Sequence, residues 1–204
     1  MLVITLQASV LGLGAGLAPG PLLALVMAES LSGGLAAGIR VALAPLITDA
    51  PIVALGWGLA GGLDPQSPWL GALSVVGALV VAHLALAQWH AVLPEPGHAK
   101  VKGALGRGVA VNLLSPHPWL FWITLGGPLL AAAARETWWP AVAFLLTFYA
   151  LLVGTKVVLA LVTTRWGRGL TDRGYRRACR ALGVVLALFA VRLGWDGLAR
   201  LIGL

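Results

Sequence analysis

The sequence predicts an all-α integral membrane protein with six transmembrane helices, arranged as two inverted three-helix repeats. Of its 204 residues, 59% are hydrophobic and only 10% are charged, a balance typical of chains embedded in lipid. No charged residue occurs between Leu2 and Met27, and a helix needs about 20 apolar residues to cross roughly 30 Å of hydrocarbon. Two Pro-x-Pro elements, one in each half of the chain, interrupt apolar segments and suggest the repeat.

Connectors rich in turn-forming and charged residues separate the apolar segments. The predicted spans cover residues 2–28, 37–62, 69–92, 109–132, 138–162 and 181–204. We expect a single domain over residues 1–204, with one repeat at about 1–93 and the other at about 105–204. Three spans per repeat is an odd number, so the second repeat would cross the membrane in the opposite direction to the first.

The lysines and arginines predict the orientation of the chain. If the connectors alternate between two sides of the membrane, ten basic residues fall on one side, and Arg135 and Arg200 on the other. The richer side is expected to be cytoplasmic by the positive-inside rule, which places both termini outside. Its residues are Arg40, Lys100, Lys102, Arg107, Arg165, Arg168, Arg173, Arg176, Arg177 and Arg180. The N-terminus lacks a basic region, so we expect the first span to be retained rather than cleaved as a signal peptide.

Both Pro-x-Pro elements are expected to break their helices at membrane depth. They are Pro19-Gly20-Pro21 in the first span and Pro116-His117-Pro118 in the fourth. Proline removes a backbone hydrogen-bond donor and clashes with the preceding turn. Within a bilayer, the backbone groups left unpaired by such a break must hydrogen-bond to neighbouring protein or to water in a cavity. A half-helix that begins at Pro21 would direct its amide dipole at the gap and suit a carboxylate. The alternative is a packing kink.

Outside the two helix breaks, five ionisable residues lie in the middle part of the predicted spans. They are candidates for one shared cavity, because charge at the bilayer centre is costly. They are Asp49, His83, Lys156, Arg192 and Asp196. Asp49 would bind a proton or a substrate ammonium, or else pair with Lys156 or Arg192 as structural support. Lys156 would hold a substrate carboxylate or extend to the inner surface. His83 would carry protons or bond between helices.

The remaining candidates also have structural interpretations. Arg192 and Asp196 are four residues apart on one helical face, so mutual neutralisation is the favoured interpretation. Asn112 and His117 would hydrogen-bond either the freed carbonyls or the ligand. Glycines spaced four apart permit close helix contacts within one subunit or between two. These pairs are Gly12 and Gly16, Gly34 and Gly38, and Gly58 and Gly62.

Composition and motifs argue against other classes of function. No metal-ligand cluster, nucleotide-binding loop or nucleophile triad occurs, so we expect neither an enzyme nor a cofactor. The net charge of +7 comes from residues between apolar spans rather than from a solvated face, which argues against a nucleic-acid partner. The single cysteine, Cys179, excludes an internal disulfide and a dithiol redox conduit. A second copy of the chain is left open as a partner.

The chain resembles the LysE/RhtB family of amino-acid exporters over nearly its whole length. Pro19-Gly20-Pro21 is similar to the first-helix signature of that family, residues 38–49 to its glycine-rich second helix ending in an acid, and residues 112–116 to its Asn-Pro element. Leu22, Thr48 and His117 differ from the residues that are usual at these positions in the family. These differences concern the identity of the substrate more than the fold. The resemblance implies a secondary exporter in the bacterial cytoplasmic membrane that is driven by the proton-motive force.

We therefore expect proton antiport of amino acids or related small metabolites out of the cytoplasm. The sequence candidates for substrate or proton coupling are Pro19, Gly20, Pro21, Asp49, Asn112, Pro116, His117, Pro118 and Lys156, with His83 as a proton carrier. A passive channel or an exporter of an inorganic ion is the alternative. An intramembrane enzyme or assembly subunit is disfavoured because no catalytic constellation is present.

Overall fold

The computed structural model describes residues 2–62, 68–90, 103–135, 137–166 and 172–202. Helices account for the regular structure of these residues, and no strand occurs among them. In chain order the elements are α1 (Leu2–Leu17), α2 (Pro21–Ala42), α3 (Ala44–Gly61), α4 (Pro68–Trp89), α5 (Ala104–Leu114), α6 (Pro116–Phe121), the π-helix η1 (Trp122–Gly126), α7 (Gly127–Ala133), α8 (Trp139–Trp166) and α9 (Asp172–Ile202).

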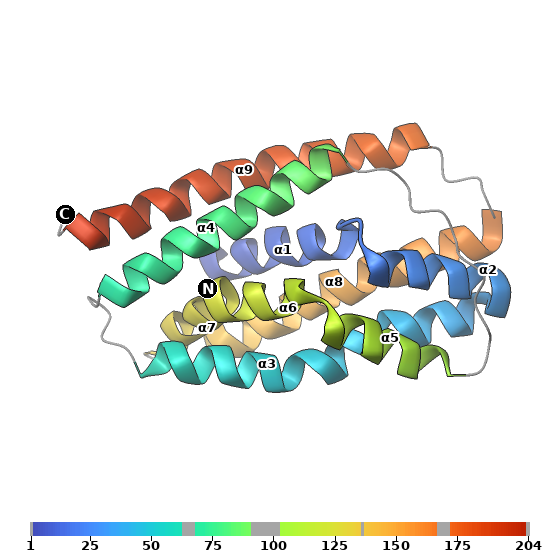
Figure 1. The fold of residues 1–204 in the computed structure, drawn as a ribbon, viewed down its shortest axis with the longest axis horizontal. Helices are drawn as coiled ribbons and strands as arrows, with labels where there is room; N and C mark the ends of the chain where they lie inside the picture. Colours follow the sequence, from blue (N-terminus) through green and yellow to red (C-terminus); the bar gives the residue numbers. More distant parts are fainter. Residues whose placement is uncertain (1, 63–67, 91–102, 136, 167–171, 203–204) are drawn as a thin grey trace.

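The helices run roughly along the long axis of the molecule (Figure 1). α1 continues into α2 in a similar direction, and α5, α6, η1 and α7 likewise follow one another toward the opposite end. Within α2 the chain turns at Gly34, whose φ of 75° lies in the left-handed region that glycine adopts without a steric penalty. The end of α2 and α3 then run back along the molecule.

Three described segments are long and apolar enough to cross a bilayer. They are Pro21–Gly61, which includes the turn at Gly34, Pro68–Trp89, and Trp139–Arg165. α1 and α5 are apolar but shorter, because each ends at an interruption instead of continuing into the next helix. The arrangement of six spans in two inverted repeats therefore stays a prediction.

Two helix boundaries differ from the sequence expectation. α9 begins at Asp172, so arginines that were expected in a connector, among them Arg173 and Arg180, extend the last helix instead. Most residues of this basic segment favour or tolerate a helix, and nothing between Arg173 and Arg180 forces a break. The second predicted span divides at Leu43, where α2 ends and α3 begins, because Pro45 near the start of α3 cannot supply a helical amide donor.

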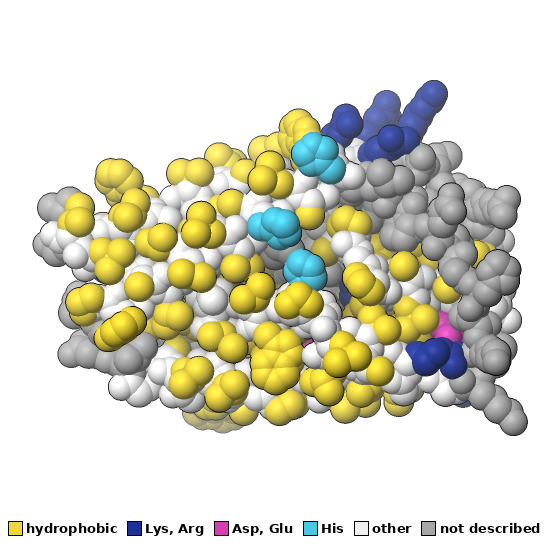
Figure 2. All heavy atoms as spheres, in the orientation of Figure 1, with side chains coloured by type: hydrophobic (Ala, Val, Ile, Leu, Met, Phe, Trp, Pro, Cys, Tyr) yellow, Lys and Arg dark blue, Asp and Glu magenta, His cyan; other side chains and the backbone are white. Residues whose placement is uncertain are grey.

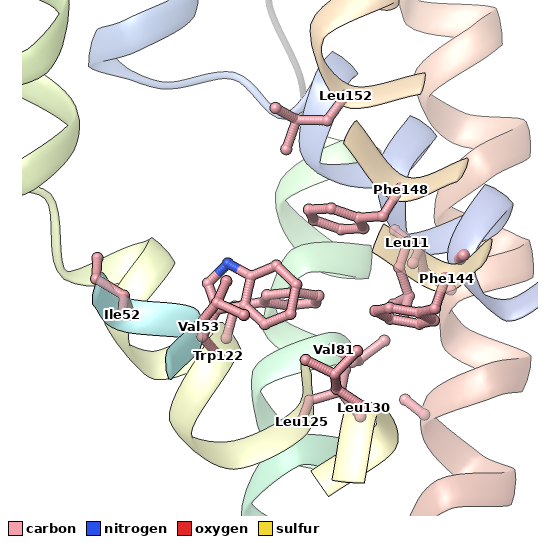
Figure 3. Close-up of a cluster of buried hydrophobic side chains, with 14 of the residues drawn as sticks. Leu11, Ile52, Val53, Val81, Trp122, Leu125, Leu130, Phe144, Phe148 and Leu152 are labelled. Carbon is pink, nitrogen blue, oxygen red and sulfur yellow. The ribbon is translucent and has the colours of Figure 1, made fainter. Parts of the chain in front are cut away.

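The core lies where α1, α3, α8 and η1 meet. Figure 3 shows Trp122 between Val53 on one side and Phe148 and Phe144 on the other. The ring centroids of Trp122 and Phe148 are 5.2 Å apart, and the ring planes are inclined by 73°. This is the edge-to-face arrangement that aromatic pairs favour. Gly56 lets α3 approach this core, because an added Cβ would lie 2.4 Å from the Trp122 carbonyl oxygen.

Candidate functional site

The first helix break separates α1 from α2. α1 ends at Leu17, and α2 begins at Pro21 after Gly20, whose φ of 178° and ψ of 176° are fully extended. Proline suits the first position of a helix because the amide it lacks would have no intrahelical partner. The amide of Ala24 then donates to the Gly20 carbonyl at 3.0 Å and closes the first turn of α2.

The second break has the same form. α5 ends at Leu114, Ser115 is extended with φ −74° and ψ 131°, and α6 begins at Pro116. The Ser115 amide donates to the Val111 carbonyl at 3.1 Å, which caps the end of α5. Each interruption therefore ends one apolar helix and starts another at a proline.

Residues of both breaks line a single cavity of about 250 Å³, called the central cavity below. Figure 2 shows histidine side chains beside a hollow in this face of the molecule. Nine of the sequence-predicted site residues line the central cavity: Pro19, Gly20, Pro21, Asp49, His83, Asn112, His117, Pro118 and Lys156. Pro116 is exposed next to the lining residues Ser115 and His117 but does not line the cavity itself.

Asp49 on α3 is the carboxylate of the central cavity and is only 3% exposed. Its Oδ1 accepts hydrogen bonds from Asn112 Nδ2 at 2.9 Å and from Thr48 Oγ1 at 3.2 Å. Its Oδ2 accepts from Tyr149 at 3.2 Å and from the Trp122 indole at 3.4 Å. All four donors are neutral, and no ion pair of Asp49 occurs among the described residues. The interpretation of Asp49 as one half of an ion pair is therefore not supported.

Thr48 and Asn112 connect α3 to α5 at this carboxylate. Asn112 Nδ2 also lies 2.6 Å from Thr48 Oγ1. The Thr48 hydroxyl has one proton, and its two acceptors are Asp49 Oδ1 and the Ala44 carbonyl at 3.1 Å. It can donate to only one of them at a time, so the number of hydrogen bonds to Asp49 is adjustable without movement of the backbone.

Lys156 on α8 also lines the central cavity and is 4% exposed. Its ammonium donates to the carbonyls of Gly16 at 3.0 Å and Ala15 at 3.2 Å, at the end of α1. The last carbonyls of a helix lack intrahelical donors and carry the negative end of the helix dipole, so a cation is favoured there. The alternative in which Lys156 extends to the inner surface is wrong, because its side chain is buried against this helix end.

His83 on α4 and His117 on α6 lie on the exposed side of the central cavity. Both side chains are exposed, and their rings stack with centroids 6.3 Å apart and planes inclined by 15°. The sequence did not predict this pairing, because the two residues belong to different halves of the chain. Both residues also line the central cavity.

Arg192 and Asp196 do not join this site. Both are exposed on α9, and neither lines the central cavity. The expectation that all five ionisable residues converge is therefore wrong for this pair, because α9 packs mainly on α4 at the edge of the molecule (Figure 1). No ion pair between them is found in the described part of the chain.

Sequence reasoning missed three donors to Asp49 as members of the site. Thr48, Trp122 and Tyr149 are uncharged, so the cost of intramembrane charge does not distinguish them from other span residues. A search for all hydrogen-bonding side chains inside the spans would have included them. The ion pair of the buried Glu29 and the half-buried Arg107 was also missed, because both residues were assigned to span ends and connectors.

Comparison with known protein families gives one match. The family described as LysE type translocator matches residues 14–197, which include both helix breaks and every residue that lines the central cavity. Neither the search of curated proteins nor the search of solved structures gives a significant match.

Proposed function

This chain belongs to the LysE type translocator family, and we propose that it exports amino acids or related small metabolites from the bacterial cytoplasm by proton antiport. As a member of that family it is a multi-pass membrane protein that translocates small molecules. The single observation that carries the proposal is the buried carboxylate of Asp49, which faces a cavity between two broken helices and is held by neutral donors alone.

The surroundings of Asp49 support an exchange between a proton and a cationic group. Its four neutral partners orient both oxygens without neutralising the charge. A buried carboxylate without a counter-ion is unfavourable in a low-dielectric site, so it gains from a proton or from a substrate ammonium. The two compete for the same oxygens, and competition of this kind couples outward movement of substrate to inward movement of protons.

The part of the central cavity beside Lys156 and the start of α2 suits a carboxylate. Lys156 uses two hydrogen-bonding contacts on the end of α1, and an ammonium has three N–H donors, so one donor is left for a ligand. Leu22 and Leu23 also line the cavity in the first turn of α2, where backbone amides have no intrahelical acceptor and favour anions. A zwitterion would thus place its ammonium near Asp49 and its carboxylate near Lys156 and α2.

The size of the central cavity limits the substrate class. Its volume is about 250 Å³, below the roughly 300–1,000 Å³ typical of sites for drug-sized ligands. Apolar residues such as Leu152 and Phe148 complete the lining, so a small metabolite with a short apolar part fits better than a peptide. Asn112 and His117 would contact the ligand, and Pro19, Gly20, Pro21 and Pro118 would shape the two breaks.

The exposed histidines supply a route for protons in this proposal. His83 and His117 lie between the outside of the molecule and the cavity that contains Asp49. Histidine exchanges protons near neutral pH, so a stacked pair would pass protons to and from the carboxylate. The location in the cytoplasmic membrane, the two inverted repeats and the external termini belong to the same proposal, which reporter fusions to each terminus would test.

Counterflow in proteoliposomes tests the function. Vesicles that contain the full chain are loaded with a mixture of labelled amino acids, and efflux is followed with and without an imposed pH gradient. We expect saturable efflux of one amino-acid class that the gradient accelerates. Asp49→Asn should abolish the response to the gradient, whereas Asp196→Asn, which removes an exposed carboxylate on α9, should leave it intact.

Other results would replace the proposal with a defined alternative. Flux that neither saturates nor responds to the gradient would indicate a passive channel. No efflux of any amino acid would indicate another substrate, such as an inorganic ion. Equal gradient response in Asp49→Asn and the unsubstituted protein would remove Asp49 from the coupling mechanism.

A further inference from the structure

An apolar groove runs along the outer surface between α4 and α9 and is separate from the central cavity. Its volume is about 580 Å³, and every lining residue is apolar. Its lining combines small residues, among them Ala82, Ala85 and Gly183, with larger side chains such as Leu86 and Leu188. None of its lining residues also lines the central cavity, so the proposed transport function does not account for it.

The face of α9 that lines the groove continues into a row of arginines. At about 100° per residue, the groove-lining positions from Gly183 to Val191 fall on the same side of the helix as Arg180, Arg176 and Arg173. These arginines are exposed, and Figure 2 shows Lys and Arg side chains gathered over the beginning of α9. They are called the arginine face below. The groove therefore has an apolar length and a basic end.

The dimensions of the groove match one leaflet of a bilayer. On α4 it extends from Ala78 to Trp89, which at about 1.5 Å per residue corresponds to roughly 16 Å. Half of a hydrocarbon core about 30 Å thick is nearly the same length. Trp89 marks the basic end of the groove, and tryptophan is enriched at the level of lipid headgroups. The arginine face would then lie at headgroup depth.

We propose that the groove and the arginine face together bind one anionic phospholipid. The acyl chain lies between α4 and α9, and the phosphate contacts Arg173 and Arg180. Guanidinium groups bind phosphate oxygens in paired hydrogen bonds, and basic clusters next to membrane helices recognise anionic headgroups. A zwitterionic lipid would fill the groove equally well but would gain less from the arginines, so the site selects for headgroup charge.

A second copy of the chain fits this surface less well. Two-fold symmetric dimers bring the same patch of each subunit together. Such contact with both chains in the same orientation in the membrane would place two arginine faces next to each other, and like charges in contact oppose association. An anionic lipid neutralises the same charges, which is why we assign the surface to lipid.

Lipid titration of the purified full-length protein tests the site. Phosphatidylglycerol or phosphatidylcholine is added in detergent, bound lipid is counted by native mass spectrometry, and the unfolding temperature is recorded. We expect one tightly bound phosphatidylglycerol and a rise in unfolding temperature, since a ligand that binds the folded state stabilises it. Arg173→Gln/Arg180→Gln should weaken phosphatidylglycerol binding by roughly thirtyfold, from the loss of two interfacial arginines.

Two further variants separate the groove from general charge effects. Arg40→Gln/Arg165→Gln removes the same charge from exposed positions on other helices and should leave binding unchanged. Ala187→Phe fills the groove and should lower lipid binding while the arginines remain. Equal binding of both lipids, equal loss in the control pair, or no effect of Ala187→Phe would each overturn the proposal. The proposal would also be overturned if inorganic phosphate alone stabilised the protein, or if a dimer persisted when lipid was added.

Discussion

Asn112 and Asp49 are joined by a hydrogen bond of 2.9 Å between residues that are 63 positions apart in the chain. Asn112 belongs to the last turn of α5, directly before the second helix break, and Asp49 belongs to α3. This contact brings a residue of the second break to the carboxylate that the first half of the chain supplies. The central cavity is therefore assembled from both halves.

Replacement of Asn112 by alanine should lower both stability and export. The buried Asp49 carboxylate would lose its shortest hydrogen bond, and a bond to a charged group contributes about 1.5–3 kcal/mol. Unfolding in detergent and efflux from proteoliposomes measure the two effects. Leu113→Ala, at an exposed neighbouring position, is the control and should change neither strongly. An Asn112→Ala protein as stable as the control would show that the bond contributes little.

Replacement of Lys156 by methionine should destabilise the end of α1. Methionine approximates the length of lysine but has no donor, so the Ala15 and Gly16 carbonyls would lose their partner. A buried acceptor without a donor costs about 1–3 kcal/mol. Thermal unfolding measures the loss, with Arg165→Gln at the exposed end of α8 as a control. If the two variants unfold alike, Lys156 does not hold this helix end.

The role of Lys156 in substrate binding has its own readout. If its remaining donor contacts a substrate carboxylate, Lys156→Met should reduce export of a zwitterion much more than export of the matching amine without the carboxylate. An equal reduction for both compounds would assign Lys156 to the support of α1 alone.

Gly56 and Gly58 should respond in opposite ways to alanine. An added Cβ at Gly56 would meet the Trp122 carbonyl oxygen at 2.4 Å, whereas nothing lies within 4 Å of one at Gly58. Overpacking of this kind costs about 1–3 kcal/mol, while alanine in an open helical position is favoured over glycine by about 1 kcal/mol. We expect Gly56→Ala to lower the unfolding temperature and Gly58→Ala to maintain or raise it. The same direction of change in both would contradict the packing of α3 on η1.

The glycine spacing itself did not predict this difference. Gly12 and Gly16 lie against backbone or Cβ atoms of α8, so that spacing brings two helices of one subunit together. Gly58 and Gly62 have the same spacing, but no other helix among the described residues lies within 4 Å of a Cβ added at either. A Cβ added at Gly56, which lies outside the pattern, would meet the backbone of η1 more closely than one at Gly12 or Gly16 would meet α8. The spacing indicates where two helices could pack closely. Which of these positions actually contact another helix depends on the three-dimensional arrangement.

The helix breaks and Asp49 were predictable because they violate local rules. Prolines and a carboxylate inside apolar spans are costly wherever the helices go, so their presence indicates a site before any fold is known. The exposed position of Arg192 was not predictable in this way. It depends on the rotation of α9 about its axis, which packing against α4 fixes. The hydrogen bonds from Thr48 and Tyr149 to Asp49 were not predictable either, because neutral polar residues are tolerated in many spans and do not by themselves indicate a site.

The ion pair of Glu29 and Arg107 connects α2 and α5, the two helices that flank the breaks. Arg107 donates to Glu29 Oε1 through Nε at 2.8 Å and also through Nη2. The Glu29 side chain is fully buried, whereas that of Arg107 is 33% exposed. Removal of Arg107 would leave a buried charge without its partner, which costs about 3–5 kcal/mol. Removal of both charges should cost less.

A double-mutant cycle measures this coupling. We expect Arg107→Gln to lower the free energy of unfolding more than Glu29→Gln/Arg107→Gln, because the doubly substituted protein buries a neutral amide instead of a carboxylate. Arg40→Gln removes an exposed arginine of α2 and controls for the change in net charge. If the effects of the two single substitutions add, the pair is not coupled, and the contact between α2 and α5 would depend on the apolar residues around Val26 and Ala104 instead.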